Sequence, residues 1–251
     1  MKNLFLFVCL CILTLTSCAQ GEKTFEEKYN IQFDYSYQPD TWSLVKYDTL
    51  SGNEKEKFTA FISKCLSKYP EDFFTKINLK YVVLGKDLMF DKDYRAAVPD
   101  NYKNQMYFSY RESYEDYYIA HSVFHEMNHY AEFSIWNTYT YNWPKWKVLY
   151  NGGRQGGVTA YANSNIVDYY SIGTGPAGFI NLYSTLGEEE DRSDLIAFFM
   201  NDLENEHNRM MDKVKSDTLL QKKLKLVLTL YKEKLGFGSL LETYEKEMNE
   251  K

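Results

Sequence analysis

The stretch 114–134 reads YEDYYIAHSVFHEMNHYAEFS and is the most informative part of the 251-residue chain. Apolar side chains recur along it every four residues, at Ile119, Val123, Met127 and Ala131. Neither Gly nor Pro interrupts the run, and this spacing is typical of a helix with a buried apolar face. We therefore expect a buried helix over these residues.

The centre of this predicted helix carries an HExxH motif, His125-Glu126-Met127-Asn128-His129. Two histidines four residues apart lie on one helical face, one turn apart, so both imidazoles can bind the same cation. A glutamate directly after the first histidine can reach a water molecule bound to that cation. The motif therefore predicts a zinc site at His125 and His129, with Glu126 as the general base.

A catalytic zinc site needs a third protein ligand and an open position for water. Only two other histidines are present, His121 and His207, and no Gly and His continue the motif, so the three-histidine metzincin arrangement is excluded. His121 lies one turn before His125, and three histidines spaced over about 12 Å of helix are too far apart for one ion. We therefore expect a carboxylate as the third ligand, and a packing role or a cleft contact for His121.

Acidic residues are concentrated at the start of a second predicted helix, over about 188–208. Glu190 and Asp194 are four residues apart and therefore share one face of this helix. Glu188 is better placed to cap the helix, and Glu189 points about 100° away from Glu190. Glu190 is therefore the preferred candidate, and Glu189 is the alternative.

The string from Glu190 to Asp194 resembles the gluzincin pattern, in which the glutamate binds zinc and the acid one turn later supports a ligand histidine. Tyr183 lies seven residues before Glu190, a separation similar to that in lethal-factor-like gluzincins, where the tyrosine lies beside the metal. The stretch 178–200, together with 29–35, resembles a family of bacterial lipoproteins described as zinc-binding metallopeptidases.

This resemblance implies a zincin-like α+β domain that binds Zn²⁺ and hydrolyses peptide bonds with a zinc-activated water. It implies that Asp194 supports a ligand histidine and that Tyr183 donates a hydrogen bond to the developing oxyanion. It also implies that an edge strand upstream of the motif, either 77–85 or 105–110, pairs with extended substrate. Carried over residue by residue, the site consists of the metal ligands His125, His129 and Glu190, the catalytic residues Glu126 and Tyr183, and Asp194 behind the ligands.

The chain departs from the family pattern at two neighbouring positions. Asp194 stands where Glu is more common and has one methylene less reach, and Ser193 replaces the usual Ala. Neither change removes a function that the site needs. Beyond about residue 205 the resemblance ends.

The N-terminus predicts a lipoprotein signal. An apolar run too short to span a bilayer ends in Leu15-Thr16-Ser17-Cys18, which resembles a bacterial lipobox. We expect 1–17 to be removed, Cys18 to carry the lipid and 18–28 to form a tether to a membrane of the bacterial cell envelope. Ala19 is not a retention Asp, which favours the outer membrane by analogy and leaves the membrane face open.

Composition restricts the remaining alternatives. Of the four cysteines, only Cys65 lies beyond the lipobox, so neither an intramolecular disulfide nor a cysteine-based zinc site is available. The net charge of −6 argues against nucleic-acid binding, which favours a basic surface. The length suits one domain over 29–251, which we expect to be a monomer.

The order of the predicted elements indicates an α+β fold, with a small N-terminal mixed sheet followed by a mostly helical C-terminal half. Thr185-x-x-Glu188 is interpreted as a capping box for the second helix. The Trp residues of the insert either line a cleft or cover the core. The other predicted elements are strands over 30–37, 77–85 and 105–110, a helix over 53–68, an insert loop over 135–178, and helices over 217–235 and 239–249.

The sequence therefore predicts a lipid-anchored zinc metallopeptidase that acts on a peptide or protein substrate of unspecified sequence. The alternative is a catalytically silent lipoprotein that uses the same scaffold to bind peptide or glycan. Intact Glu126 and Tyr183 favour the enzyme, because a protein that has lost its activity tends to lose such residues. A metal-free structural protein would require the motif to have arisen by chance.

Overall fold

The computed structural model describes residues 23–150 and 170–250. The predicted signal peptide, Cys18 and residues 151–169 of the predicted insert lie outside the described residues. Residues 25–28, which were expected to belong to a tether, instead form most of helix α1 (Phe25–Tyr29), where Thr24 caps the first turn. In the described part of the chain, no helix combines the length and apolar character needed to cross a membrane.

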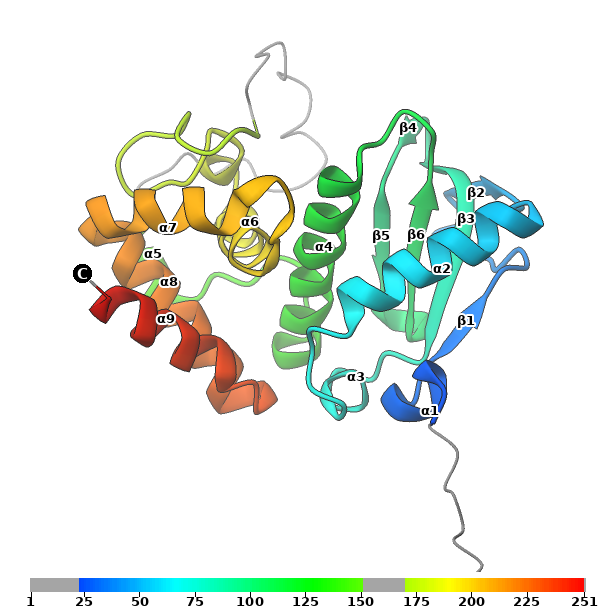
Figure 1. Ribbon diagram of the computed structural model, residues 1–251, viewed down its shortest axis with the longest axis horizontal. Coiled ribbons are helices and arrows are strands. Elements are labelled where there is room, and N and C mark those ends of the chain that lie inside the picture. The colour runs from blue at the N-terminus through cyan, green and yellow to red at the C-terminus, as the bar shows by residue number, and fades with distance from the viewer. Residues whose placement is uncertain (1–22, 151–169, 251) are drawn as a thin grey trace, which may run out of the picture.

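A mixed sheet forms one side of the molecule (Figure 1). Its strand order is β1-β3-β6-β5, and β2 and β4 pair with the later half of β3. β1, β3 and β6 are parallel to one another, whereas β5 is antiparallel to β6 and forms an edge that contacts helix α4. The strands are β1 (Gln32–Asp34), β2 (Val45–Asp48), β3 (Tyr81–Phe90), β4 (Asp93–Tyr94), β5 (Ala97–Asp100) and β6 (Gln105–Tyr110).

The strand predicted at 105–110 is confirmed as β6, but the strand predicted at 77–85 is shifted along the chain. Residues 77–79 follow the short helix α3 (Phe73–Lys76), and Asn78 adopts a left-handed conformation with φ of 59°. The extended conformation therefore begins at Tyr81, and pairing with β2 and β4 continues it to Phe90. These partner strands were not predicted.

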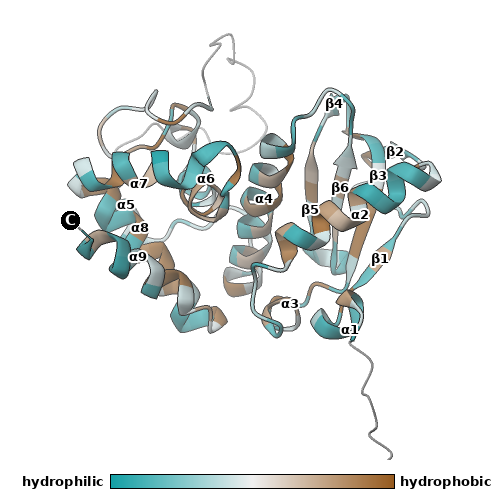
Figure 2. Cartoon of the chain, in the orientation of Figure 1, coloured by the Kyte–Doolittle hydropathy of each residue, from teal (hydrophilic) through white to brown (hydrophobic). Residues whose placement is uncertain are grey.

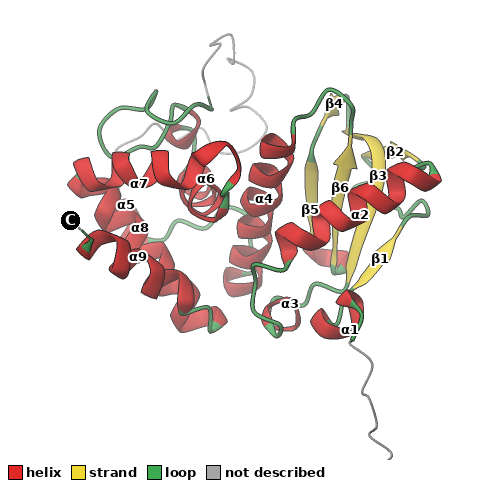
Figure 3. Ribbon diagram, viewed as in Figure 1, coloured by secondary structure: helices red, strands yellow, loops and turns green. Residues whose placement is uncertain are grey.

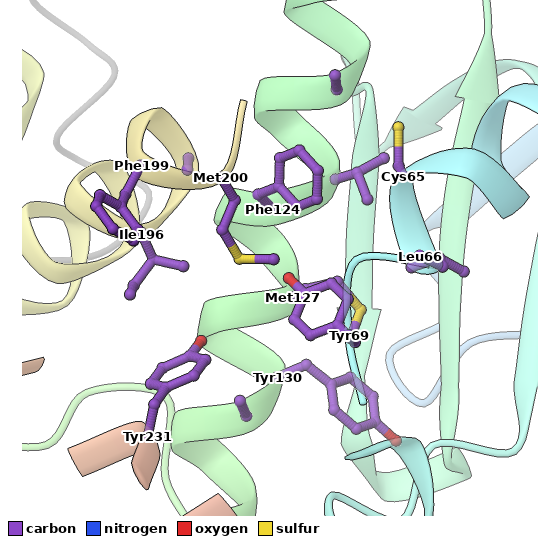
Figure 4. Close-up of a cluster of buried hydrophobic side chains, with 14 of the residues drawn as sticks. Cys65, Leu66, Tyr69, Phe124, Met127, Tyr130, Ile196, Phe199, Met200 and Tyr231 are labelled. Atoms are coloured by element: carbon purple, nitrogen blue, oxygen red, sulfur yellow. The ribbon is translucent and has the colours of Figure 1, made fainter. Parts of the chain in front are cut away.

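Helix α4 (Asp116–Trp136) is the central element of the fold (Figures 1 and 4). The sheet and helix α2 (Gly52–Leu66) lie on one side of it, and the C-terminal helices lie on the other. Phe124, Met127 and Tyr130 of α4 belong to a core cluster that includes Leu66 on the α2 side and Ile196 on the C-terminal side. Burial on both sides explains why even polar side chains of α4, among them Asn128 and Glu132, lie in the interior.

The C-terminal half is helical, and strands occur only before α4 in the described residues (Figure 3). This arrangement confirms the predicted α+β class. α7 and α9 lie on the outside and carry many hydrophilic residues (Figure 2). The helices that follow α4 are α5 (Pro144–Lys147), α6 (Glu188–Met200), α7 (Glu206–Ser216), α8 (Thr218–Leu230), a π-helical turn (Tyr231–Leu235) and α9 (Ser239–Asn249).

The helix predicted over 188–208 is in fact two helices, because the chain turns after Met200. Glu204 and Asn205 have left-handed φ angles of 50° and 59°, which no α-helix accommodates. The predicted capping box at Thr185 is also wrong. Gly187 is the N-cap of α6, and the Thr185 hydroxyl donates instead to the carbonyl oxygen of Leu182.

Cys65 should be inert in the folded protein. Its side chain is 6% exposed in the core, and burial raises the pKa of its thiol to about 12. Because the thiolate is the reactive species, we expect the native thiol to react with a disulfide reagent roughly a hundredfold more slowly than the unfolded one. The measurement uses a chain that begins at Ala19, with Ser67→Cys in a Cys65→Ala background as the exposed control. Fast reaction of native Cys65 would show that this part of the core is open.

Candidate metal centre

Three side chains converge where α4 packs against α6. His125 and His129 lie one turn apart on α4, and Glu190 lies in the first turn of α6. The two Nε2 atoms are 3.0 Å apart, and Glu190 Oε2 lies 3.0 Å from His125 Nε2 and 3.4 Å from His129 Nε2. The three residues, all buried, form a group that could hold a metal ion.

The donor atoms fit a tetrahedral metal ion. With metal–ligand distances of about 2.0–2.1 Å, neighbouring ligand atoms in a tetrahedral site lie roughly 3.3 Å apart, close to the observed separations. Two imidazole nitrogens that face one another at this distance cannot both carry protons, so at least one of the pair offers a lone pair. Imidazole nitrogens and carboxylate oxygens are donors that zinc binds.

The orientation of His125 is set by Asp194, one turn after Glu190 on α6. Asp194 Oδ1 accepts a hydrogen bond from His125 Nδ1 at 2.8 Å, which leaves His125 Nε2 free to act as a ligand. Asn181 Nδ2 donates to the other carboxylate oxygen of Asp194, also at 2.8 Å. The structure thus brings Asp194 behind a ligand histidine, and Asn181 is a further support that the sequence patterns did not identify.

Both carboxylates are ionised in this arrangement. Burial alone would raise the pKa of Glu190, but the charge of His129 and the hydrogen bonds with both histidines hold this pKa well below its ordinary value. Burial would likewise raise the pKa of Asp194, and hydrogen bonds with His121 and His125 outweigh it and lower this pKa. The two carboxylates therefore carry negative charge at neutral pH that can balance the charge of a bound cation.

Glu126 lies beside the three converging residues and is not one of them. Its side chain is half-buried and lines two adjoining cavities, of about 260 Å³ and about 80 Å³. Burial raises the pKa of Glu126, against the charges of His129 and His125. A carboxylate with raised pKa in a cleft is a stronger proton acceptor than an exposed one, as a general base requires.

Tyr183 lies on the other side of His125, in a 3-10 turn before α6. Its ring centroid is 5.7 Å from that of His125 and 4.8 Å from that of Tyr170, and the side chain is only 4% exposed. It lines the smaller cavity together with His125 and Glu126. The structure therefore brings Tyr183 to the site that the sequence pattern assigned it to.

His121 contacts the support of the site rather than the three converging atoms. Its Nε2 lies 3.3 Å from Asp194 Oδ1, and its ring packs on Phe198 at 4.3 Å between centroids. His121, His125 and Asp194 are themselves close enough to hold an ion. That ion would have to displace the hydrogen bond between His125 Nδ1 and Asp194, so we interpret His121 as a second partner of this carboxylate.

Glu189, the alternative ligand, lines the larger cavity but does not join the converging atoms. His207 is also remote from them: its Nδ1 donates a hydrogen bond to the Phe199 carbonyl oxygen, and its Nε2 lies 2.9 Å from the Glu247 carboxylate of α9. Neither residue belongs to the group of donor atoms formed by His125, His129 and Glu190.

Two buried pairs of ionisable side chains connect α6 to α4 and α8 directly after Glu190. Arg192 donates to both carboxylate oxygens of Glu132 on α4, at 2.5 and 2.8 Å. Lys223 of α8 lies 2.8 Å from Asp191. Each of these four side chains is at most 2% exposed. Because every buried charge has a partner on another helix, the register of α6 against α4 and α8 is specified, and with it the position of Glu190.

Of the two roles considered for the tryptophans of the predicted insert, Trp136 and Trp146 take the covering role and not the cleft role. Trp146 is fully buried, and the guanidinium carbon of Arg192 lies 5.6 Å from its ring centroid. Trp136 lies 5.3 Å from the same carbon and stacks on Tyr141. Neither lines the cavities at the metal centre, so both act as cover for the buried ion pair.

The edge strand that faces the site is β5, not 77–85 or 105–110. β3 and β6, which contain most of those residues, both lie inside the sheet with a strand on either side. β5 is a short strand after a tight turn, and the sequence pattern did not reveal it. Ala97 of β5 lines both cavities beside Glu126, so the open edge of the sheet runs past the metal centre.

Comparisons with known proteins identify a solved structure with a similar fold. No protein-family model matches the chain, and no relative is found among curated proteins. The structure is similar to the crystal structure of a candidate zinc-binding metallopeptidase from Bacteroides caccae, with a TM-score of 0.58 and 16% sequence identity. The likeness covers 90% of this chain and 88% of that one, so it extends over the whole domain. At this identity the comparison establishes a shared fold.

Proposed function

We propose that the chain is a zinc-dependent metallopeptidase in which His125, His129 and Glu190 hold the metal. The observation that carries this proposal is the convergence of their three donor atoms, 3.0–3.4 Å apart, beside a half-buried Glu126 in an open cleft. The fold shared with a candidate zinc-binding metallopeptidase supports it. A purely structural zinc site would have no need of a half-buried, unligated carboxylate at its open side.

Each residue then has a chemical role. Bound zinc supplies a Lewis acid that lowers the pKa of a coordinated water to about 7. Glu126 takes a proton from the attacking water and delivers it to the leaving amine. Tyr183 donates a hydrogen bond to the carbonyl oxygen as negative charge develops on it. Asp194 keeps His125 in the tautomer that leaves Nε2 free.

The open edge of β5 would bind the substrate backbone. The Ala96 carbonyl accepts a hydrogen bond from Ser109 N in β6, so the alternation of a strand directs the backbone groups of Ala97 toward the open edge. An extended peptide that pairs with Ala97 passes directly in front of Glu126. The scissile bond is thereby held between β5 and α4.

Apolar side chains form one wall of the larger cavity, on the His129 side of the centre. They belong to Trp42, Phe90, Val98, Pro99 and Tyr139. Trp42 is 38% exposed and packs edge-on against Phe90 at 5.9 Å between centroids. We propose that a bulky apolar residue of the substrate occupies this position. Such a side chain would cover the exposed aromatic wall and remove apolar surface of both partners from water.

The location of the protein is proposed from the sequence. The lipobox at Cys18 supports a lipid-anchored protein of the bacterial cell envelope, in the outer membrane, with the domain working as a monomer on peptide or protein substrates.

Removal of the metal should abolish activity. We expect about one equivalent of zinc in the purified protein, cleavage of a peptide library, and loss of cleavage with a chelator that added zinc reverses. Glu190→Ala should lose the zinc, whereas Glu189→Ala, its equally acidic neighbour, should retain it. Metal analysis and library cleavage on the three proteins test this. Zinc bound without any cleavage would favour the silent binding protein, and chelator-resistant cleavage would refute a metal mechanism.

A further inference from the structure

We propose that Ser193, Asn128 and Tyr231 act as positioning residues for His129, so that the C-terminal helices form part of the metal centre. The inference rests on the proposed function, because it takes His129 as a metal ligand. We call these three residues the His129 support chain. They come from α6, from α4 and from the turn that follows α8.

The side chains of the support chain form consecutive hydrogen bonds through the interior. The Tyr231 hydroxyl donates to Asn128 Oδ1 at 2.8 Å, and Asn128 Nδ2 donates to Ser193 Oγ at 2.9 Å. Ser193 Oγ lies 3.3 Å from His129 Nδ1. All three side chains are fully buried, so water does not replace any of these partners.

The direction of these bonds follows from the position of His129. Its Nε2 faces His125 and Glu190, so this nitrogen can bind a metal only if the ring proton resides on Nδ1. The Nδ1–H group then donates to Ser193 Oγ. A serine oxygen has two lone pairs and can accept from His129 and from Asn128 at once. The support chain therefore gives the Nδ1–H group an acceptor and so supports the tautomer of His129 that ligation requires.

The two ligand histidines are thus supported in different ways. His125 donates to the carboxylate of Asp194 on α6, whereas His129 donates to a neutral hydroxyl whose orientation depends on Asn128 and Tyr231. Tyr231 begins the π-helical turn at Tyr231–Leu235, which widens the end of α8 at this point. Three consecutive hydrogen bonds therefore connect the turn after α8 to the metal ligand His129.

A purely structural role would have a different signature. Removing any buried hydroxyl lowers stability, so stability alone does not distinguish the two roles. Tyr130 provides a matched control. It is also fully buried, it follows His129 in the sequence, and its hydroxyl donates to the Asn78 carbonyl at 3.3 Å, away from the centre. Tyr130→Phe removes the same group as Tyr231→Phe without touching the support chain.

The test compares zinc affinity, measured by competition with a chromophoric chelator, in the full chain and in Ser193→Ala, Tyr231→Phe and Tyr130→Phe. We expect Ser193→Ala to weaken zinc binding by roughly 10–100-fold. Tyr231→Phe should weaken it by a smaller factor, and Tyr130→Phe should leave it unchanged. With Co²⁺ in place of zinc, the visible absorption bands should shift in the first two variants and not in the third.

Two results would overturn the inference: wild-type zinc affinity in Ser193→Ala, or the same affinity in Tyr231→Phe as in Tyr130→Phe. Either result, in a wild-type protein that binds zinc and cleaves peptides, leaves the proposed function intact and removes only the support chain. A wild-type protein that binds no zinc refutes the proposed function, and the inference with it. The double variant Ser193→Ala/Tyr231→Phe should bind zinc no more weakly than Ser193→Ala, because both changes interrupt one chain.

Discussion

Replacing Glu126 with Gln is expected to leave the metal bound and to lower peptide hydrolysis by roughly 10²–10⁴-fold. Gln has nearly the shape of Glu, and Glu126 is not among the three residues whose donor atoms converge, so the centre should stay assembled. An amide, however, cannot accept a proton from water at neutral pH. The loss should therefore appear in kcat, with little change in zinc content.

The control for this experiment is Glu189→Gln, the same substitution in a second acidic residue that lines the same cavity. It should retain zinc and most of its activity, because Glu189 lies apart from the converging donor atoms. Zinc content and kcat are measured on both variants and the wild type. Hydrolysis at the wild-type rate by pure Glu126→Gln protein would refute the mechanism, even if zinc were present.

Replacing Arg192 with Met is expected to destabilise the domain by about 3–5 kcal/mol. Arg192 is fully buried and makes two hydrogen bonds to Glu132, so its removal leaves a carboxylate charge in the interior without a partner. Because α6 is anchored to α4 by this pair, the variant should also bind zinc more weakly. Urea unfolding in the presence of a chelator measures the stability without the contribution of bound metal.

A double variant separates the buried charge from the lost packing. In Arg192→Met/Glu132→Leu no charge is stranded, so most of the stability should return. Lys246→Met provides the exposed control, since Lys246 and Glu250 form an ion pair at 3.7 Å with side chains 77% and 62% exposed. That change should cost at most about 1 kcal/mol. An effect of Arg192→Met as small as that of Lys246→Met would show that the buried pair does not hold α6.

Local patterns in the sequence predict the features that depend on neighbouring residues. The four-residue recurrence of Ile119, Val123 and Met127 predicts α4 to within about two residues of its observed limits. β6 begins and ends where its pattern indicates. The spacing within HExxH likewise puts His125 and His129 on one helical face, because that relation is set by the geometry of a single helix.

Predictions that depend on long-range pairing were less accurate. β3 begins four residues later than expected because α3 and the left-handed Asn78 precede it. It extends to Phe90 because β2, which is distant in the sequence, and the very short β4 pair with its later half. The second helix ends at Met200 because Asn201 leaves the helical conformation, and the left-handed conformations of Glu204 and Asn205 then separate it from α7. The substrate edge was assigned to the wrong strands, since the sequence pattern does not reveal the neighbours of a strand in the sheet.

Motifs in the sequence predict which chemical groups form the centre. Whether these groups converge in space depends on how α4, α6 and α8 pack. Helical spacing selected Glu190 from a run of acidic residues and a resemblance supported that choice. In the structure, buried pairs such as Asp191 with Lys223 orient α6 so that Glu190 faces the histidines. Tyr231 and Asn128 carry no motif at all. They lie far apart in the sequence. They are hydrogen-bonded to one another because a buried polar group needs a partner that is close in space, whatever its position in the sequence.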